Sequence, residues 1–303
     1  MQKIIIIAGP TGVGKTALSI EVAKKYNGEV VSADSIQIYK GLDIGSAKVT
    51  KEEADGIVHH LIDIVSPESE YSAGDYAKDA EKAISEIAKK GKIPIVVGGT
   101  GMYITSLLFE PGVTCGKDEK YRKELEELGE KYGSPYLHKM LEKVDPESAK
   151  LIHENHQTRI IRALEIFHVS GKKKSEQKSS VLPKYDYLLF GLTADREILY
   201  DRINKRVDKM LDSGLLSEVQ GLINSGITDK NQCMQGIGYK ETYNYLTGKT
   251  DKEEFITKLK QASRNYAKRQ ITYFKKVPGI VWKTYQEKDQ IFEMIDSFLE
   301  NKQ

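Results

Sequence analysis

An α/β fold built around a parallel sheet is predicted by three observations in the sequence. Short continuous apolar runs have the length and composition of strands that are buried on both faces. These runs lie at residues 3–8, 29–33, 93–97 and 187–192. Helical patterns separate the first three runs, and a glycine-rich turn joins the first run to its helix. Alternation of strand and helix is typical of a parallel sheet with right-handed crossovers.

Helices are predicted where apolar side chains recur at helical spacing. In the first part of the chain, they lie at residues 16–25 and 77–90. From about residue 114 to 184 there are helices and turns without a good strand, with helices at residues 121–132, 134–143, 146–152 and 158–170, then a polar loop. The last helices are predicted at residues 195–213, 215–224, 238–247, 251–276 and 287–300, with a short edge strand at residues 280–283.

These patterns predict two domains. An α/β core made of residues 1–113 and 186–303 contains the sheet and ends in C-terminal helices. A helical insertion domain at residues 114–185 interrupts it.

The composition is that of a soluble globular protein. Of 303 residues, 39% are hydrophobic and 30% are charged, and no apolar run approaches the roughly 20 residues of a membrane span. We therefore expect a cytoplasmic protein with no membrane segment. The two cysteines, Cys115 and Cys233, lack the spacing of a disulfide framework or a zinc site. The net charge of +2 neither supports nor excludes nucleic acid, although basic clusters lie at residues 172–174 and 264–276.

A phosphate-binding loop follows the first predicted strand. The motif G-x-x-x-x-G-K-[ST] is matched by Gly9, Pro10, Thr11, Gly12, Val13, Gly14, Lys15 and Thr16. Its glycines let backbone N–H groups point at phosphate oxygens, and the start of the next helix adds to the anion site. Lys15 can reach the terminal phosphate, and the Thr16 hydroxyl can bind Mg²⁺. The sequence thus predicts a P-loop NTPase-like core that binds a di- or triphosphate, which need not be ATP.

Polar residues and glycines follow the second and third strands. Asp34 comes directly after residues 29–33, at the edge of the sheet where ligands bind in open parallel sheets. It could be a general base, a magnesium ligand or a helix N-cap. After the third strand, the glycines of residues 98–101 permit close approach of a ligand or of another backbone. His59 and His60 are adjacent, so they rarely share one metal, and we interpret them as structural.

Taken together, the motifs resemble the tRNA dimethylallyltransferases, also called tRNA isopentenyltransferases, of the bacterial type. After the P-loop, the matching segments are DSIQIYKGLDIGSAK, HHLIDIV, YSAGDY, PIVVGGTGMY, TRIIRALEIF, RVDKMLDSGLLSEV, QGIGYKE and YAKRQITYF. They follow the family's order and cover nearly the whole chain. Ser46, Ser263 and Tyr273 depart from the family, which commonly has Thr, Thr and Trp at these positions.

The resemblance implies a prenyl transfer to tRNA. A dimethylallyl group would pass from dimethylallyl diphosphate to the exocyclic amine of the adenosine 3′-adjacent to the anticodon, in tRNAs reading codons that begin with U. The P-loop would hold the diphosphate of the donor. Asp34 matches the family's general base, and Lys15, Thr16 with Mg²⁺ and Arg206 would stabilise the leaving diphosphate. In a helical projection, Arg206 shares a face with Arg202 and Lys209.

The resemblance also implies a tRNA-binding surface. The target base is stacked in the anticodon loop, so it must be flipped out to reach Asp34. The matching positions are Asp34, Ser35, Ile36, Gln37, Thr100, Arg122, Thr158, Arg159, Ile160, Ile161, Arg162, Gln235, Gly236, Ile237, Gly238, Tyr239 and Lys240. The insertion domain would contact the anticodon stem-loop. The basic, aromatic helix at residues 264–276 could line the donor tunnel, grip tRNA or pack the core.

Three other functions compete with this one. A relative that prenylates free adenine nucleotides would share the P-loop and Asp34, but it should not need an insertion with Arg159 and Arg162. A small-molecule kinase is a more remote alternative. A GTP-dependent switch is disfavoured because the sequence lacks an N-K-x-D motif. We expect a monomer that acts on tRNA.

Overall fold

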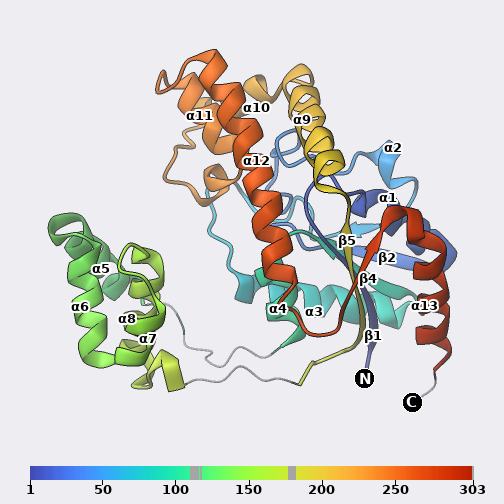
Figure 1. The fold of residues 1–303 in the computed structure, drawn as a ribbon, viewed down its shortest axis with the longest axis horizontal. Coiled ribbons are helices and arrows are strands. Elements are labelled where there is room, and N and C mark those ends of the chain that lie inside the picture. Colours follow the sequence, from blue (N-terminus) through green and yellow to red (C-terminus); the bar gives the residue numbers. More distant parts are fainter. Residues whose placement is uncertain (110–115, 117, 177–181, 302–303) are drawn as a thin grey trace. The chain divides into compact units, whose positions relative to one another are not determined.

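The computed structural model describes residues 1–109, 116, 118–176 and 182–301, so Cys115 lies outside the described residues. This part of the chain forms two compact units (Figure 1). The core unit consists of Met1–Leu108 and Lys184–Gln303, and the insertion unit of Phe109–Pro183. The boundaries therefore lie at residues 108 and 183, where the sequence predicts 113 and 185.

Across the described residues, six strands form one parallel sheet in the order β3-β2-β4-β1-β5-β6. They are β1 (Lys3–Ala8), β2 (Gly28–Ser32), β3 (His59–His60), β4 (Ile93–Gly98), β5 (Asp186–Thr193) and β6 (Ile280–Thr284). In the central strand, Ile5 lies beside Ile95 of β4 and Leu188 of β5. Because all the strands run the same way, their carboxyl ends meet at one edge of the sheet. The predicted α/β fold class is confirmed.

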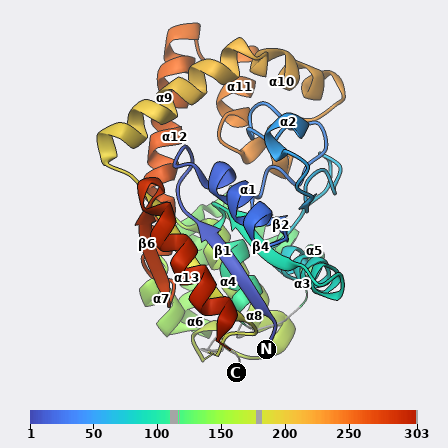
Figure 2. The ribbon, with the colours of Figure 1, turned by 90° about the vertical axis from the view of Figure 1, so that its right-hand side faces the viewer.

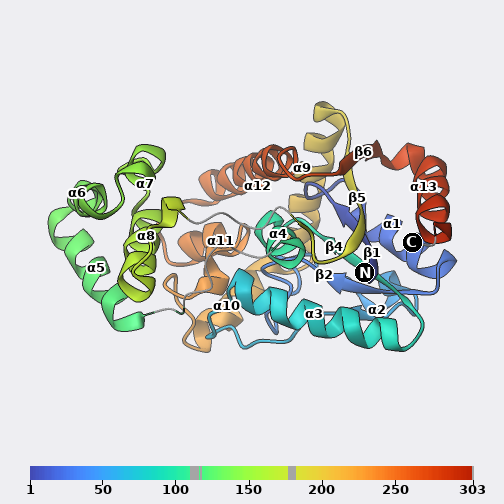
Figure 3. The ribbon, with the colours of Figure 1, turned by 90° about the horizontal axis from the view of Figure 1, so that it is seen from below.

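The helices of the core unit cover both faces of the sheet. They are α1 (Lys15–Lys25), α2 (Lys51–Ala54), α3 (Ala73–Lys89), α4 (Gly101–Leu108), α9 (Arg196–Asp212), α10 (Leu215–Asn224), α11 (Tyr239–Leu246), α12 (Lys252–Phe274) and α13 (Lys288–Glu300), with 3₁₀ turns η2 (Gln232–Gln235) and η3 (Tyr285–Glu287). Ile5 and Ile7 pack with Leu18 of α1 and Ile291 of α13. The opposite face is covered by α3 and α4 (Figure 3).

The last helices of the core gather beyond the carboxyl ends of the strands. Figures 1 and 2 show α9, α10, α11 and α12 at this end of the core unit. Leu199 and Ile203 of α9 and Ala267 of α12 join the main hydrophobic cluster, which fixes both helices beside the sheet. Long segments from the C-terminal third of the chain are therefore placed directly over the edge where a parallel sheet binds its ligands.

Three short elements were not expected from the sequence. They are α2, β3 and α4. The two-residue strand β3 is too short to produce a periodic pattern, and α4 starts inside a glycine-rich segment that reads as loop. The helix α3 begins at Ala73 rather than at residue 77, because Ser72 and Asp75 form a capping box at its N-terminus.

The insertion unit is helical, as predicted. It contains α5 (Glu119–Tyr132), α6 (Ser134–Val144), α7 (Pro146–Leu151), α8 (Gln157–Ser170) and the 3₁₀ turn η1 (Lys174–Glu176), which lies within the predicted loop. Ile160 and Ile161 of α8 are buried in its core with Leu125 of α5 and Leu137 of α6. Their side chains thus pack the unit, and the contact of these two positions with tRNA stays a prediction.

His60 has a structural partner in the core unit. Its Nε2 lies 2.7 Å from a carboxylate oxygen of Glu29, a side chain that is only 3% exposed. Lys92 and Lys90 also donate to this carboxylate, at 2.8 and 3.1 Å. Burial alone would raise the pKa of Glu29, but the hydrogen bonds from Lys92, His60 and Lys90 outweigh it and lower the pKa to about 2. Glu29 therefore ties the first residues of β2 to β3 and to the end of α3.

We predict that Glu29→Ala lowers the free energy of unfolding by about 1–3 kcal/mol at pH 7, because it removes charge-assisted hydrogen bonds from a buried group. Because the pKa of Glu29 is lower in the folded protein than in the unfolded chain, its ionised carboxylate stabilises the protein above pH 4.5. This contribution is lost as the pH falls toward 2. Urea unfolding at several pH values should show that the difference in free energy of unfolding between Glu29→Ala and the unaltered protein becomes smaller below pH 4.5.

The control is Asp201→Ala, which removes an ion pair with Lys205 that is more than half exposed on both sides. Its effect should stay within about 0.5 kcal/mol, as for other surface pairs. A Glu29→Ala effect no larger than that of Asp201→Ala would contradict the stabilising role of Glu29.

Candidate active site

A cavity of about 640 Å³ lies at the carboxyl edge of the sheet in the core unit. The P-loop borders it after β1, and Asp34 borders it after β2. Arg206 of α9 and Tyr266 of α12 line it from the C-terminal helices. The P-loop, Asp34 and Arg206, which are far apart in the sequence, are thus brought together around one space.

Lys15 and Arg206 bring two cationic groups to this cavity. Lys15 is the first residue of α1, and its Nζ donates to the carbonyl of Pro10 at 2.8 Å. Burial and the neighbouring Arg206 charge lower the pKa of Lys15 to about 7, against the opposing effect of Asp34. Burial also lowers the pKa of Arg206, and Asp34 and Glu53 offset part of this change. The site therefore holds cations whose charge is poorly solvated, the condition that favours binding of an anion.

Arg206 differs in exposure from the two basic residues with which it shares a face of α9. Arg202 and Lys209 are exposed, whereas Arg206 is half-buried and lines the cavity. Its Nη2 donates to the carbonyl of Ser46 at 3.2 Å, a contact with a loop 160 residues earlier in the chain. Arg206 is thus separated from the solvated basic face that the sequence pattern suggested.

Asp34 accepts two backbone hydrogen bonds through one oxygen. Oδ1 accepts from the N–H of Ile36 at 2.9 Å and from the N–H of Gln37 at 3.3 Å, so the side chain caps the turn that follows β2. Among the described residues, no hydrogen-bond partner is found for Oδ2. The two possibilities of a cap and a base are therefore compatible, because each would use a different oxygen of the same carboxylate.

Gln270 of α12 fixes the P-loop, and the sequence did not indicate this role. Its Oε1 accepts from the N–H of Thr11 at 3.0 Å, and its Nε2 donates to the carbonyl of Gly99 at 3.0 Å. The N–H of Thr11 is thus already bonded within the protein. A signal was present: Ser263, Ala267 and Gln270 lie three or four residues apart on the buried face of α12.

The glycines after β4 allow close approach to other protein groups. A Cβ at Gly98 would lie 2.1 Å from the carbonyl oxygen of Ala33, and a Cβ at Gly99 would lie 2.1 Å from Nε2 of Gln270. Either distance is far inside van der Waals contact. At Gly98, the neighbour is another backbone, one of the two possibilities raised by the sequence; at Gly99, it is a side chain, which the sequence did not suggest.

Tyr266 borders the cavity, and Thr100 lies between it and the segment after Asp34. The Thr100 hydroxyl accepts from the N–H of Ser35 at 3.0 Å and interacts with Tyr266. Burial and the charge of Asp34 raise the pKa of Tyr266 to about 12, so its hydroxyl stays protonated at neutral pH. Tyr266 was not singled out among the site residues, although it belongs to the basic, aromatic helix.

The helix at residues 264–276 serves several purposes. Tyr266 and Arg269 line the cavity, and Lys268 is exposed. Arg264 donates to Oδ1 of Asn204 in α9 at 2.7 Å, which joins two helices of the core. The possible roles in lining a site, in packing and in facing solvent are thus divided among different residues.

The segment at residues 235–240 only partly faces the cavity. Gln235, Gly236, Ile237 and Gly238 line it. Lys240 is exposed to solvent. Tyr239 is fully buried, and its hydroxyl donates to Oε1 of Glu218 at 2.7 Å. The side chain of Tyr239 therefore packs the core unit, and the contact of this position with tRNA stays a prediction.

The insertion unit carries its own basic surface. Arg122 and Arg162 both bond Oε2 of Glu165, at 2.8 and 2.6 Å. Burial and the charges of Arg159 and Arg162 lower the pKa of Lys174, which places these three cations near one another. Thr158 and Arg159 are exposed at the start of α8. In the part of the unit that is described, the buried carboxylate of Glu165 thus orients the guanidinium groups of Arg122 and Arg162.

Thr16 and Asp34 supply oxygen atoms of the kind that bind a divalent cation. The exposed Thr16 and the Asp34 carboxylate both border the cavity. The described residues contain no cluster of three or more His, Cys, Asp or Glu side chains that could hold a metal by themselves. A hydroxyl and one carboxylate fit an ion such as Mg²⁺ that takes its other ligands from phosphate oxygens and water.

The comparisons with known proteins agree with one another. The family model described as IPP transferase matches residues 37–277. A tRNA dimethylallyltransferase of Bacillus anthracis is 50% identical over 304 aligned residues, which cover 99% of this chain and 96% of the relative.

The similar solved structures are also transferases of this kind. The tRNA isopentenylpyrophosphate transferase of Bacillus halodurans is 43% identical with a TM-score of 0.75, over 99% of this chain and 97% of that chain. A eukaryotic dimethylallyltransferase, described as acting on tRNA, is 34% identical with a TM-score of 0.84, over 100% of this chain and 81% of that chain. No helix among the described residues is long and apolar enough to cross a membrane. With a family model and a close relative that both span most of the sequence, the chain belongs to the IPP transferase family.

Proposed function

We propose that this protein transfers a dimethylallyl group from dimethylallyl diphosphate to the exocyclic amine of an adenosine in tRNA and releases diphosphate. The nucleoside is the adenosine 3′-adjacent to the anticodon, in tRNAs that read codons beginning with U. The observation that carries the proposal is the convergence of the P-loop, Arg206 and Asp34 on one cavity in a chain of this family.

The two cations would bind the diphosphate of the donor. Negative charge grows on the diphosphate as the bond from its oxygen to the allylic carbon breaks, so fixed cations stabilise the transition state more than the ground state. Lys15 and Arg206 face the same space, and burial strengthens their interaction with an anion. The P-loop and the start of α1 add backbone N–H groups. The loop would thus hold a leaving group.

Asp34 would be the general base. The exocyclic amine of adenine is a weak nucleophile because its lone pair is delocalised into the ring, so a nearby base must accept its proton. Oδ1 is held by the N–H groups of Ile36 and Gln37, which leaves Oδ2 to accept that proton. The new carbon–nitrogen bond forms as diphosphate leaves with the electron pair of the old carbon–oxygen bond.

Thr16, together with phosphate oxygens and water, would hold a magnesium ion. When bound, the ion would neutralise part of the charge that develops on the diphosphate. Thr16 follows Lys15 at the start of α1, so both side chains are directed by the same turn of helix.

The insertion unit would contact the anticodon stem-loop of the tRNA. The protein would bind tRNA as a monomer. Exposed Thr158 and Arg159, together with Arg122 and Arg162, offer hydrogen-bond donors and positive charge to a phosphate backbone. In the core unit, Ser35, Gln37, Thr100 and residues 235–238 would border the flipped base. Such contacts must supply the few kcal/mol that unstacking a base costs.

Transfer to free adenine nucleotides remains the competing activity. We predict that protein supplied with Mg²⁺ and labelled dimethylallyl diphosphate labels unmodified tRNA faster than AMP when both acceptors are present. The physical reason is that contacts outside the cavity help to place the target base. Faster labelling of AMP would contradict the assignment of tRNA as the acceptor.

For the base, we predict that Asp34→Asn lowers kcat by about 10²–10⁴-fold. Asparagine keeps the Oδ1 that caps the turn, so tRNA affinity and the free energy of unfolding should change little. Asp34→Ala should lose the same activity and also about 1 kcal/mol of stability, because the N–H groups of Ile36 and Gln37 lose their acceptor. Single-turnover rates, tRNA binding and urea unfolding separate these effects. Near-normal transfer by Asp34→Asn would exclude Asp34 as the base.

For Lys15, we predict that diphosphate binding takes up a proton. Its pKa of about 7 in the free protein leaves it mostly neutral at pH 8, and a bound anion raises that pKa again. Affinity for the donor should therefore be constant below pH 7 and fall as the pH rises above it. Calorimetry at pH 8 in buffers of different ionisation enthalpy should show uptake of about one proton per donor molecule.

The matched control is Lys15→Met, which cannot titrate and should lose both the proton uptake and the pH dependence. Equal proton uptake in Lys15→Met and in the unaltered protein would show that another group titrates.

A further inference from the structure

The loop at residues 43–47 supports two side chains of the cavity. The carbonyl oxygen of Ser46 accepts from Nη2 of Arg206 at 3.2 Å. Nε2 of Gln37 lies 3.4 Å from this carbonyl and 3.3 Å from the carbonyl of Ala47. The position of this loop thus decides where the guanidinium of Arg206 and the amide of Gln37 are held.

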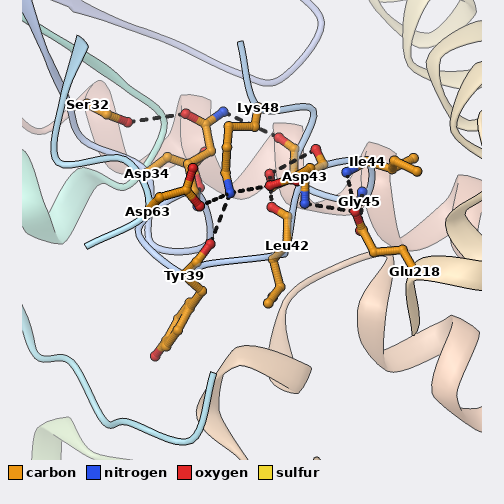
Figure 4. Close-up of polar contacts among 12 residues, drawn as sticks. Ser32, Asp34, Tyr39, Leu42, Asp43, Ile44, Gly45, Lys48, Asp63 and Glu218 are labelled. Carbon is orange, nitrogen blue, oxygen red and sulfur yellow. Dashed lines mark hydrogen bonds and ion pairs between the residues drawn. The ribbon is translucent and has the colours of Figure 1, made fainter. Parts of the chain in front are cut away.

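One carboxylate from another part of the chain holds this loop. Oε2 of Glu218, in α10, accepts from the N–H groups of Asp43 at 2.9 Å and Ile44 at 2.7 Å. Oε1 accepts from the N–H of Gly45 at 3.1 Å and from the hydroxyl of Tyr239 at 2.7 Å. Figure 4 shows Glu218 reaching the loop from the side opposite Asp34. Three successive N–H groups that converge on one anion form a nest, an arrangement that binds negative charge well.

The surroundings of Glu218 leave the loop little freedom. A Cβ at Gly45 would lie 2.6 Å from the ring of Tyr239, so the loop backbone is packed directly on that ring. At the far end of the loop, Lys48 donates to the carbonyl of Tyr39 at 3.0 Å and to Asp63 at 2.6 Å, and it also pairs with Asp43 (Figure 4). The loop is therefore held at both ends, and among the residues that the structure describes, Glu218 supplies the acceptors for its first three N–H groups.

We propose that Glu218 is a positioning residue for diphosphate binding, and that it acts through the loop at residues 43–47 on Arg206. This inference rests on the proposed function in one respect, the assignment of Arg206 to the diphosphate. Glu218 itself is not among the residues that line the cavity. Its carboxylate fixes the nest, the nest fixes the carbonyl of Ser46, and that carbonyl holds the guanidinium at the cavity.

Glu218→Gln is the sharpest change, because it preserves shape and removes the charge. In either orientation of the new amide, its NH₂ group replaces one carboxylate oxygen. It then faces at least one backbone N–H group that has lost its acceptor. The loop must then shift. Tyr239→Phe is a second variant on the same loop, since it removes one donor to Glu218 and a hydrogen bond with the backbone of Ser46, and it keeps the ring against Gly45. Glu197→Gln, an exposed residue of α9, makes the same change of charge on the surface.

The test is a double-mutant cycle with Arg206→Gln in the full-length protein, with inorganic diphosphate and Mg²⁺ as the probe in calorimetry. We expect Glu218→Gln to weaken diphosphate binding by about tenfold, within the usual coupling of residues in one network. Tyr239→Phe should weaken it less, and Glu197→Gln should leave it unchanged. In the Arg206→Gln background, neither Glu218→Gln nor Tyr239→Phe should weaken binding further.

A role confined to folding would give a different pattern. Effects of Glu218→Gln and Arg206→Gln that simply multiply, or an unchanged diphosphate affinity in folded Glu218→Gln, would overturn the proposal. If Glu218→Gln does not fold, the same comparison with Tyr239→Phe decides the matter. Failure of the unaltered protein to prenylate tRNA would refute the proposed function, but the binding cycle would still test the link between Glu218 and Arg206.

Discussion

Two half-buried cations that share one cavity are the constraint on which the site depends. Lys15 and Arg206 each lose solvation, and the charge of Arg206 also disfavours the charge of Lys15, while Asp34 compensates only in part. An unligated site of this kind is electrostatically unfavourable, and an anion relieves it. The P-loop, the loop at residues 43–47 and the C-terminal helices all hold this arrangement in place.

The parallel sheet explains how such a site can be built. β1, β2 and β4 end at one edge, which brings the P-loop, Asp34 and the glycines after β4 together. Helices from the last third of the chain then close the site, with Gln270 bonding both the P-loop and the end of β4. A P-loop enclosed in this way has cations and a carboxylate on the same cavity, so it suits the proposed reaction, in which diphosphate leaves while a nucleophile loses a proton.

Local patterns predicted most of the fold and the centre of the site. Continuous apolar runs marked β1, β2, β4 and β5, and the P-loop motif marked the anion site. Gln270, Tyr266 and Glu218 were missed, because their roles depend on contacts with segments that are distant in the sequence. Ile160, Ile161 and Tyr239 were grouped with tRNA contacts because a matching stretch does not reveal which side chains point inward. The helical projection grouped Arg206 with Arg202 and Lys209 but could not reveal their different exposure, because spacing defines a helical face and not what packs against it.

The most direct test of this account is a crystal structure of the protein with Mg²⁺ and an unreactive thiolodiphosphate analogue of the allyl donor. The account predicts that the diphosphate group lies within hydrogen-bond distance of Lys15 Nζ and of the Arg206 guanidinium. It also predicts that the allylic carbon lies on the side of the cavity that Asp34 borders. A diphosphate bound away from Arg206, or an allyl group directed away from Asp34, would contradict it.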